Sequence, residues 1–152
     1  MADEVGKPGV VVREFALTDY GAAASLWRVA GPGVPWRPGD EREEIARMLD
    51  RNPGLLLVAC RGDEVVGTVI GGWDGRRGQV YHLAVDPGWR RRGVAGELMD
   101  ELEARFAALG AWKVKGEVYS DNTASLAFYR DRGYKVEDTI ARIGKELAPP
   151  AR

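Results

Sequence analysis

The most informative segment of the chain reads Leu83-Ala84-Val85-Asp86-Pro87-Gly88-Trp89-Arg90-Arg91-Arg92-Gly93-Val94-Ala95-Gly96. An apolar strand comes first, Pro87 and Gly88 break it, and a helix then begins. A helix start carries unpaired backbone N–H groups and the positive end of the helix dipole. Gly93 and Gly96 let a ligand approach the backbone, and three adjacent arginines add positive charge. The segment therefore predicts a phosphate cradle, although a solvated helix start with a charge run has the same appearance.

Two common nucleotide-binding patterns do not occur at this segment. It lacks the Gly-Lys-Ser/Thr of a Walker loop and the Gly-x-Gly-x-x-Gly of a dinucleotide fingerprint, which would also belong after the first strand. A Rossmann-type nucleotide-binding regulator is therefore the weakest of the functional alternatives.

The residues upstream predict a strand, two helices and a proline-rich connection. Residues 10–15 are rich in valine and read as a strand, with Thr18 as the N-cap of the helix that follows. Residues 31–39 hold three prolines and cannot continue that helix. Asp40, followed three residues later by Glu43, has the spacing of a capping box and predicts a second helix up to about residue 50.

The middle of the chain predicts an antiparallel meander. Its three β-rich runs are joined by turns too short for crossover connections and cover residues 54–61, 65–73 and 79–85. Consecutive strands joined in this way pair with one another in an antiparallel sheet.

The last third of the chain predicts two helices and two strands. A long helix runs from Arg91 to about Leu109 with Gly110 at its C-terminal cap, and its apolar positions recur every fourth residue at Val94, Leu98, Leu102 and Phe106. The remaining elements are a strand at 112–119, a helix at 122–132 closed by Gly133, and a final strand or hairpin at 134–147. We expect one mixed-sheet α/β domain over residues 9–147 between flexible termini at 1–8 and 148–152.

Composition excludes several classes of protein. The 22 Lys and Arg residues nearly balance the 23 Asp and Glu residues, so neither nucleic acid nor a membrane surface is an expected partner. No apolar run approaches a membrane span, and the polar opening does not resemble a signal peptide. The single cysteine, Cys60, lies in an apolar run and has no disulfide partner, which favours the cytoplasm. No metal-ligand spacing is present. A monomer and a homodimer are both compatible with the sequence.

Two motifs resemble those of one enzyme family. Arg90-x-x-Gly93-x-Ala95 after a strand is similar to the Arg/Gln-x-x-Gly-x-Gly/Ala signature of GNAT acetyltransferases. Asn122-x-x-Ser125-x-x-Phe128-Tyr129-x-x-x-Gly133-Tyr134 is similar to the family's Asn-x-x-Ala-x-x-Phe-Tyr-x-x-x-Gly-Phe. The resemblance covers about residues 10–147. The run 66–78 looks like a subgroup of small bacterial members near the ribosomal-protein N-terminal acetyltransferases.

The resemblance implies a fold, a cosubstrate and a set of binding residues. The implied fold is the GNAT α/β fold, with a central mixed, mostly antiparallel twisted sheet and helices on both faces. The implied cosubstrate is acetyl-CoA. Its pantetheine arm would bind backbone groups of Leu83, Ala84 and Val85, with Asn122 and Ser125 at the pantetheine or in its vicinity. Its pyrophosphate would bind at Arg90, Arg91, Arg92, Gly93, Val94, Ala95 and Gly96.

The chemistry of acetyl transfer suggests a base and an acid. An amine acceptor must lose a proton, and Glu117, five residues before Asn122 where several family members carry a catalytic glutamate, is the candidate base. A solvated strand carboxylate is the alternative interpretation of Glu117, and His82 or water could also take the proton. Tyr129 is the candidate acid for the leaving thiolate, although a tyrosine beside Phe128 is also typical of core packing. Freed N–H groups near Leu83 would stabilise the oxyanion.

Acetyl transfer to a primary amine by direct attack is the leading hypothesis, since no Ser or Cys is placed as a nucleophile. The acceptor is either a small amine or a protein N-terminus or Lys side chain. A non-catalytic acyl-CoA-binding regulatory module is the alternative and would not need Glu117 or Tyr129. Trp36, Trp73 and Asp74 lie on loops expected near the acceptor mouth, where isolated tryptophans more often serve as hydrophobic clamps.

Overall fold

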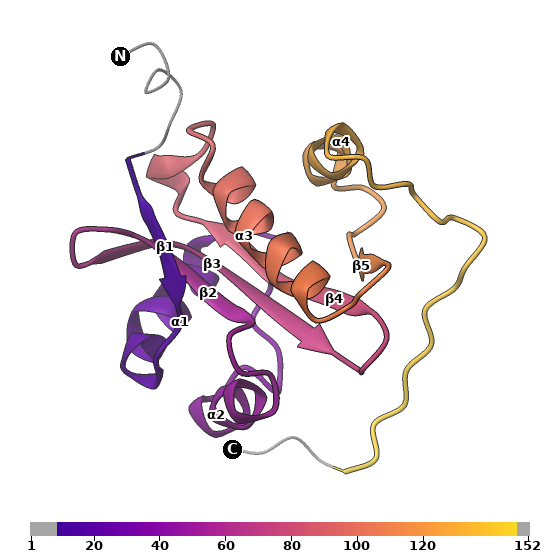
Figure 1. Cartoon of the computed structure of the whole chain (residues 1–152), viewed down its shortest axis with the longest axis horizontal. Helices are drawn as coiled ribbons and strands as arrows, with labels where there is room; N and C mark the ends of the chain where they lie inside the picture. The colour runs from indigo at the N-terminus through magenta and orange to yellow at the C-terminus, as the bar shows by residue number, and fades with distance from the viewer. Residues whose placement is uncertain (1–8, 149–152) are drawn as a thin grey trace.

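A computed structural model describes residues 9–148 of the chain. Of the predicted flexible termini, residues 1–8 and 149–152 lie outside the described residues. Within them, one five-stranded sheet has the order β1-β2-β3-β4-β5, in which β1 to β4 pair antiparallel and β5 pairs parallel with β4 (Figure 1). The strands are β1 Val11–Glu14, β2 Leu56–Arg61, β3 Glu64–Trp73, β4 Gly78–Val85 and β5 Val114–Gly116. The predicted meander is confirmed.

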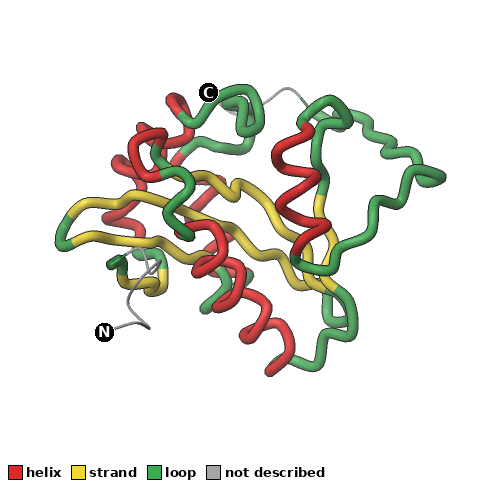
Figure 2. The backbone as a smooth tube through the Cα atoms, turned by 90° about the horizontal axis from the view of Figure 1, so that it is seen from above, coloured by secondary structure: helices red, strands yellow, loops and turns green. Residues whose placement is uncertain are grey.

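Helices cover both faces of the sheet, as Figures 1 and 2 show. The helices are α1 Tyr20–Val29, α2 Arg42–Arg51, α3 Val94–Ala108 and α4 Thr123–Asp131, with short 3-10 turns η2 Leu17–Asp19 and η3 Pro87–Trp89. Side chains of α1 and α2 form one core cluster with the sheet, and side chains of α3 and α4 join a second cluster on the other face. The predicted α/β class, with a mostly antiparallel mixed sheet, is confirmed.

The inner strand β2 contributes to both core clusters, because its side chains alternate between the two faces of the sheet. Leu56, Val58 and Cys60 belong to the cluster under α1 and α2, while Leu57 and Ala59 belong to the cluster under α3. Successive side chains of a strand point to opposite faces, so an uninterrupted apolar run is what a strand buried on both faces requires. The run that contains Cys60 is therefore explained by burial.

Two glycines of the sheet let α3 lie close against it. A Cβ atom at Gly67 would lie 2.9 Å from Val94 Cγ1, and one at Gly78 would lie 2.7 Å from the ring of Phe106. Val94 and Phe106 are the first and last members of the predicted four-residue repeat, and both are buried. Because these two glycines have no side chains, both ends of α3, including its N-terminal end, can pack closely against β3 and β4.

The predicted starts of the first two helices are wrong in detail. Thr18 lies inside η2, and α1 begins at Tyr20 after Asp19, whose carboxylate instead accepts from Ala16 N–H and Arg13. The expected capping box of Asp40 and Glu43 does not form, because α2 begins after Glu41 without a side-chain cap. Asp40 has other partners, described below.

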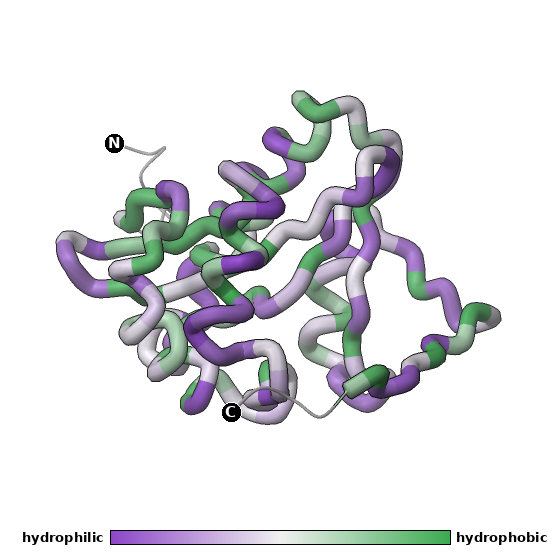
Figure 3. The backbone as a smooth tube through the Cα atoms, turned by 90° about the horizontal axis from the view of Figure 1, so that it is seen from below, coloured by the Kyte–Doolittle hydropathy of each residue, from purple (hydrophilic) through white to green (hydrophobic). Residues whose placement is uncertain are grey.

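The predicted elements at the C-terminal end are also shorter or absent. Strand β5 covers Val114–Gly116 rather than 112–119, and residues 134–148 form no strand. Hydrophilic and hydrophobic residues alternate along this stretch, at the right of Figure 3, yet Ile143 is 93% exposed. A strand needs a partner, and β5 offers only three residues, so alternation alone does not produce a strand here.

Candidate functional site

Strands β4 and β5 are paired only at the start of β4. Gly78–Val80 of β4 face Val114–Gly116 of β5, whereas β4 continues to Val85. From Tyr81 onward, the outer edge of β4 therefore extends beyond its partner, and Leu83, Ala84 and Val85 lie on this free part. Backbone groups on such an edge are available to a ligand that takes the place of the missing strand.

A β-bulge lies where this free edge begins. Between the pairs Thr68 with Ala84 and Ile70 with Tyr81, β4 has one more residue than β3. His82 is in the bulge and has a φ of +48°, a left-handed conformation that is uncommon for a residue other than glycine. Thr68 Oγ1 donates to the carbonyl of His82 at 3.1 Å and accepts from Trp27 Nε1 at 2.9 Å. These bonds hold the bulge against α1.

The helix start after β4 has the features of an anion cradle. Helix α3 begins at Val94 rather than at the predicted Arg91, because Gly93 and Arg91 both have positive φ, +84° and +61°. The first helical bond runs from Glu97 N–H to the carbonyl of Gly93 at 3.0 Å. The N–H groups of Val94, Ala95 and Gly96 precede this bond and have no acceptor within the helix. They belong to the segment that the sequence predicted to bind phosphate.

The three arginines before α3 have different partners. Arg90 donates a hydrogen bond to the carbonyl of Ala30, at the end of α1. Arg92 lies over the ring of Trp89, with 4.7 Å between its guanidinium carbon and the ring centroid, and both Arg91 and Arg92 are exposed. Neither forms an ion pair with a carboxylate among residues 9–148. Arg91 and Arg92 are therefore the cations available to an anion at the cradle.

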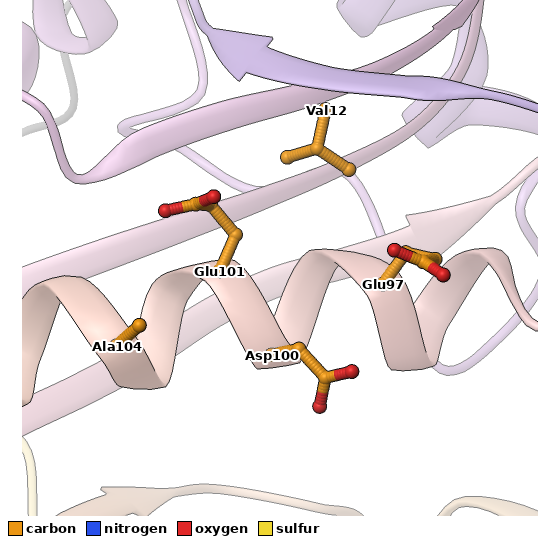
Figure 4. Close-up of a pocket in the computed structure, with 5 residues that line it drawn as sticks. All are labelled: Val12, Glu97, Asp100, Glu101 and Ala104. Carbon is orange, nitrogen blue, oxygen red and sulfur yellow. The ribbon is translucent and has the colours of Figure 1, made fainter.

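Farther along α3, the charge of the surface changes from positive to negative. A hollow of about 340 Å³ between β1 and α3 is lined by Val12, Glu97, Asp100, Glu101 and Ala104 (Figure 4). Three of these five side chains are carboxylic acids, which repel an anion. The charge distribution along α3 thus favours an anion at its N-terminal end and disfavours one beside its middle.

Asn122 and Ser125 form the N-terminal cap of α4. Asn122 Oδ1 accepts from the backbone N–H of Ser125 at 3.1 Å, as an N-cap residue does. The amide nitrogen of Asn122 lies beside Gly33, where a Cβ atom would approach it to 2.9 Å. The loop between α1 and α2 therefore reaches the start of α4, and the motif asparagine has a structural role in addition to the binding role that the sequence predicted.

Tyr129 lies in a small aromatic cluster on α4. Its ring packs edge to face with Phe128 at 5.3 Å and with Tyr134 at 5.1 Å between centroids. Burial raises the pKa of Tyr129 to about 12, so its hydroxyl keeps its proton at neutral pH. A protonated, partly buried phenol can donate a hydrogen bond to a thiolate, but its raised pKa makes it a weaker acid than the sequence analysis assumed, so the role of Tyr129 stays a prediction.

Hydrogen bonds and ion pairs attach α4 and the residues after it to α3, beside Tyr129. Arg132 donates to Asp100 at 2.7 Å and to Glu103 at 2.9 Å, and the hydroxyl of Tyr134 donates to Glu103 at 2.6 Å. Burial and this bond to Glu103 raise the pKa of Tyr134. Sequence reasoning did not find Glu103 or Arg132, since their partners lie about thirty residues apart and no local pattern links them.

Glu117 lies at the point where β4 and β5 separate. It follows β5 immediately instead of lying on the predicted strand, is exposed, and forms an ion pair with Arg142 at 2.7 Å. Burial, and to a lesser extent the charge of Glu117, raise the pKa of Tyr81, so Glu117 lies near the start of the free edge of β4. Its ion pair is open to solvent, and such pairs contribute little and exchange readily.

His82 forms a pair with Asp40 that sequence reasoning missed. Nε2 of His82 lies 2.7 Å from Oδ1 of Asp40, and because a carboxylate only accepts, Nε2 carries the hydrogen. Asp40 is buried, and its other oxygen accepts from Arg37 N–H at 2.9 Å. Tyr20 donates to the carbonyl of Asp40 at 2.7 Å. The pair joins the connection between α1 and α2 to the bulge of β4, across 42 residues of sequence.

Removing the carboxylate of this pair should lower stability. In Asp40→Ala, the N–H groups of His82 and Arg37 lose their acceptor in a mostly buried place, so the free energy of unfolding should fall by about 1–3 kcal/mol. Urea denaturation of wild type and mutant measures the change. Asp50→Ala is the matched control, since Asp50 is exposed on α2 and should change stability by less than about 0.5 kcal/mol. Equal losses in the two variants would contradict the assignment.

The three loop residues expected near an acceptor have structural roles. Trp36 packs against Trp27 at 6.3 Å between centroids and carries Arg28 over its face at 4.0 Å. Trp73 packs against the core cluster under α3. Asp74 accepts from the N–H groups of Arg76 and Arg77, which closes the turn between β3 and β4. Trp73 is the last residue of β3 rather than a loop residue, and Trp73 and Asp74 also line a hollow beside α2, so their place near an acceptor stays a prediction.

Other classes of site find no support in residues 9–148. That part of the chain contains no group of three or more His, Cys, Asp or Glu side chains able to hold a metal ion. None of its helices has the length and apolar character needed to cross a membrane. Cys60 is a free, buried thiol whose pKa is raised by burial.

Comparison with known proteins agrees with this geometry. The model of the acetyltransferase (GNAT) family matches residues 21–134. An acetyltransferase from Sodalis glossinidius is 37% identical over 136 residues, which cover 90% of this chain and 94% of that protein. Two solved structures share the fold. One is a PaiA N-acetyltransferase from Thermoplasma acidophilum in complex with coenzyme A, with a TM-score of 0.78 at 18% identity over 86% of this chain and 92% of that one.

The other is the ribosomal-protein-S18-alanine N-acetyltransferase from Escherichia coli, with a TM-score of 0.68 at 20% identity over 82% of this chain and 76% of that one. Members of the matched family use acetyl-CoA. The family match covers most of the chain, and the relative from Sodalis is aligned over nearly its whole length. The chain therefore belongs to the GNAT family and is an acetyltransferase.

Proposed function

We propose that the protein transfers the acetyl group of acetyl-CoA to a primary amine by direct attack. The observation that carries the proposal is the free edge of β4, Tyr81 to Val85, which leads directly to the unpaired N–H groups at the start of α3. An extended amide-containing arm fits a strand edge, and a pyrophosphate fits a helix start. Acetyl-CoA contains these two parts in this order.

The residues that would hold acetyl-CoA follow from this fit. Backbone groups of Leu83, Ala84 and Val85 would bind the pantetheine arm, with Asn122 and Ser125 near it. The N-terminal turn of α3, Gly93 to Gly96, would bind the pyrophosphate together with Arg91 and Arg92. Arg90 would join them on releasing the carbonyl of Ala30. The bound cosubstrate supplies an activated acetyl thioester, and no metal is required for its transfer to an amine.

The reaction requires a proton to leave the amine and a proton or hydrogen bond to reach the thiolate. The amine nitrogen forms a bond to the acetyl carbon, the carbon–sulfur bond breaks, and the oxyanion between these steps needs N–H donors near Leu83. We assign proton removal to Glu117, which is exposed where the strands separate. His82 is the alternative base, but its Nε2 hydrogen is directed to Asp40. We assign the hydrogen bond to the thiolate to Tyr129.

The role of Glu117 has a pH-dependent consequence. Glu117→Gln should lower turnover most near neutral pH, and raising the pH should partly restore it, because more of the acceptor amine then deprotonates without help. A pH–rate profile of both proteins measures this. Glu137→Gln is the matched control, since Glu137 is also exposed and paired with a cation, Lys113. A Glu117→Gln profile that superimposes on that of wild type would leave water or His82 as the base.

Direct attack predicts that no acetylated form of the enzyme exists during turnover. The only thiol, Cys60, is buried, and its raised pKa disfavours the reactive thiolate. Intact-mass analysis after quenching with acetyl-CoA alone should therefore show unmodified protein, while an amine screen should show acceptor-dependent release of CoA. A stoichiometric acetyl adduct that an added amine discharges would rule out the direct mechanism.

The type of acceptor and the setting are part of the same proposal. The acceptor is a primary amine, either on a small molecule or at a protein N-terminus or Lys side chain.

The free thiol of Cys60 is compatible with the reducing cytoplasm, where we place the reaction. A non-catalytic acyl-CoA-binding module is not supported, because the chain belongs to an acetyltransferase family. Either a monomer or a homodimer is compatible with this proposal.

A further inference from the structure

A second hollow lies next to the point where β4 and β5 separate. It has a volume of about 320 Å³ and lies between α2 and the outer strands, with Met48 on one side and Gln79, Tyr81 and Lys115 on the other. Lys115 is paired in register with Gln79, so the two side chains share one face of the sheet. Tyr81 is the first residue of β4 beyond the pairing. The hollow therefore opens where the acetyl group would emerge between the strands.

The lining of this hollow is positively charged. Arg51 of α2, Arg77 of the turn between β3 and β4, and Lys115 of β5 all line it. Its only carboxylate, Asp74, accepts from the N–H groups of Arg76 and Arg77 at 2.7 and 2.8 Å, bonds that lower its pKa. Among the residues that the structure describes, none of the three cations is in an ion pair.

A carboxylate lies close to the same hollow, on the side of Tyr81. Glu117 does not itself line the hollow, but it follows β5 directly, and its charge acts on Tyr81, which does line it. A ligand that fits this arrangement carries an amine at one end and an anion at the other. The volume is at the low end of the range for small-molecule sites, which favours a compact ligand over a folded protein surface.

We propose that the acceptor is a small amine that carries an anionic group, a carboxylate or a phosphate, and that Arg51, Arg77 and Lys115 bind this group. The inference rests on the proposed function, because it needs the amine to meet the acetyl thioester beside Glu117. The amine then loses its proton to Glu117 as its nitrogen takes the acetyl group from sulfur. The cations hold the anionic end and so orient the amine toward the cleft.

The first experiment compares amines that differ only in the anion. The probes are ω-amino carboxylates with three to eight carbons, aminoalkyl phosphates, and alkylamines of the same lengths, each assayed by release of CoA from acetyl-CoA. At the best length, kcat/KM should be at least about tenfold higher with the anion than without it. Whether the carboxylates or the phosphates give the higher kcat/KM shows which of the two anionic groups the acceptor carries. Equal use of alkylamines at every length would overturn the inference.

The second experiment removes the cations one at a time. Arg51→Gln, Arg77→Gln and Lys115→Gln should each raise KM for the best anionic amine by about ten- to a hundredfold, the effect of losing one charged hydrogen bond, with little change in kcat. KM for the matched alkylamine should not change. Arg47→Gln is the control, because Arg47 lies one turn earlier on α2, outside the residues that line the hollow, and forms an ion pair with Glu44 at 3.8 Å.

Calorimetry separates this inference from the function on which it rests. If CoA does not bind the wild-type protein, the proposed function fails. If CoA binds equally well to wild type and to the three variants, while KM for the anionic amine does not change in the variants, only the acceptor inference fails. The acceptor inference is also overturned if no anionic amine is acetylated and if calorimetry shows that none of them binds to the CoA-loaded protein.

Discussion

Replacing Gly93 with Asp should weaken CoA binding by about a hundredfold or more, since several charged hydrogen bonds are lost together. Gly93 is the N-cap of α3 and has a φ of +84°. A carboxylate at this position competes with the pyrophosphate for the N–H groups of Val94, Ala95 and Gly96 and repels it. Isothermal calorimetry with CoA, and the rise in melting temperature on adding CoA, both measure the loss.

A matched control is available on the same helix. Gly110 follows the other end of α3 and has a φ of +95°, so Gly110→Asp imposes similar backbone strain and the same charge away from the cradle. This variant should lose stability but keep the affinity for CoA of the wild type. If Gly93→Asp and Gly110→Asp bind CoA equally well, the anion site is not at the start of α3.

Tyr129→Phe should lower turnover by about ten- to a thousandfold, the usual effect of losing a positioned acid. The substitution keeps the ring and its contacts with Phe128 and Tyr134, so the affinity for CoA should barely change. Because the pKa of Tyr129 is raised to about 12, the wild-type hydroxyl stays protonated through the working range of pH. The ratio of wild-type to Tyr129→Phe turnover should therefore be nearly constant between about pH 6 and 9.

Tyr134→Phe provides the comparison for this experiment. It also removes one hydroxyl from the same aromatic cluster, but that hydroxyl donates to Glu103 and attaches the chain after α4 to α3. We expect Tyr134→Phe to reduce stability and to keep most of the turnover. Full activity in Tyr129→Phe would assign Tyr129 to packing alone.

The parts of the fold that could be predicted depend on local patterns. The four-residue repeat from Val94 to Phe106 marked α3, and all four of its members are buried. The short turns between β2, β3 and β4 determined the meander. The glycine-led helix start proposed to bind the pyrophosphate was also visible in the sequence, because a strand, a break and a glycine at a helix start are consecutive in the chain.

The parts that could not be predicted depend on partners distant in sequence. Residues 134–147 alternate like a strand, but β5 is too short to pair with them, and nothing within 134–147 shows the length of β5. Asp40 has the spacing of a capping residue, yet its carboxylate meets His82 on β4. Arg90 matches the family motif, yet its guanidinium bonds to Ala30. In each case, a tertiary contact outweighs the local preference.

The order of the sheet bears on how the molecule folds. Each strand lies beside its neighbour in sequence, so β2, β3 and β4 can pair through short turns as soon as they leave the ribosome. Strand β5 joins last, after the whole of α3 has been made, and α4 with Tyr129 follows it. The sheet and the phosphate cradle can therefore form before the opposite wall of the cleft exists. Catalytic competence would then be the last property that the growing chain acquires.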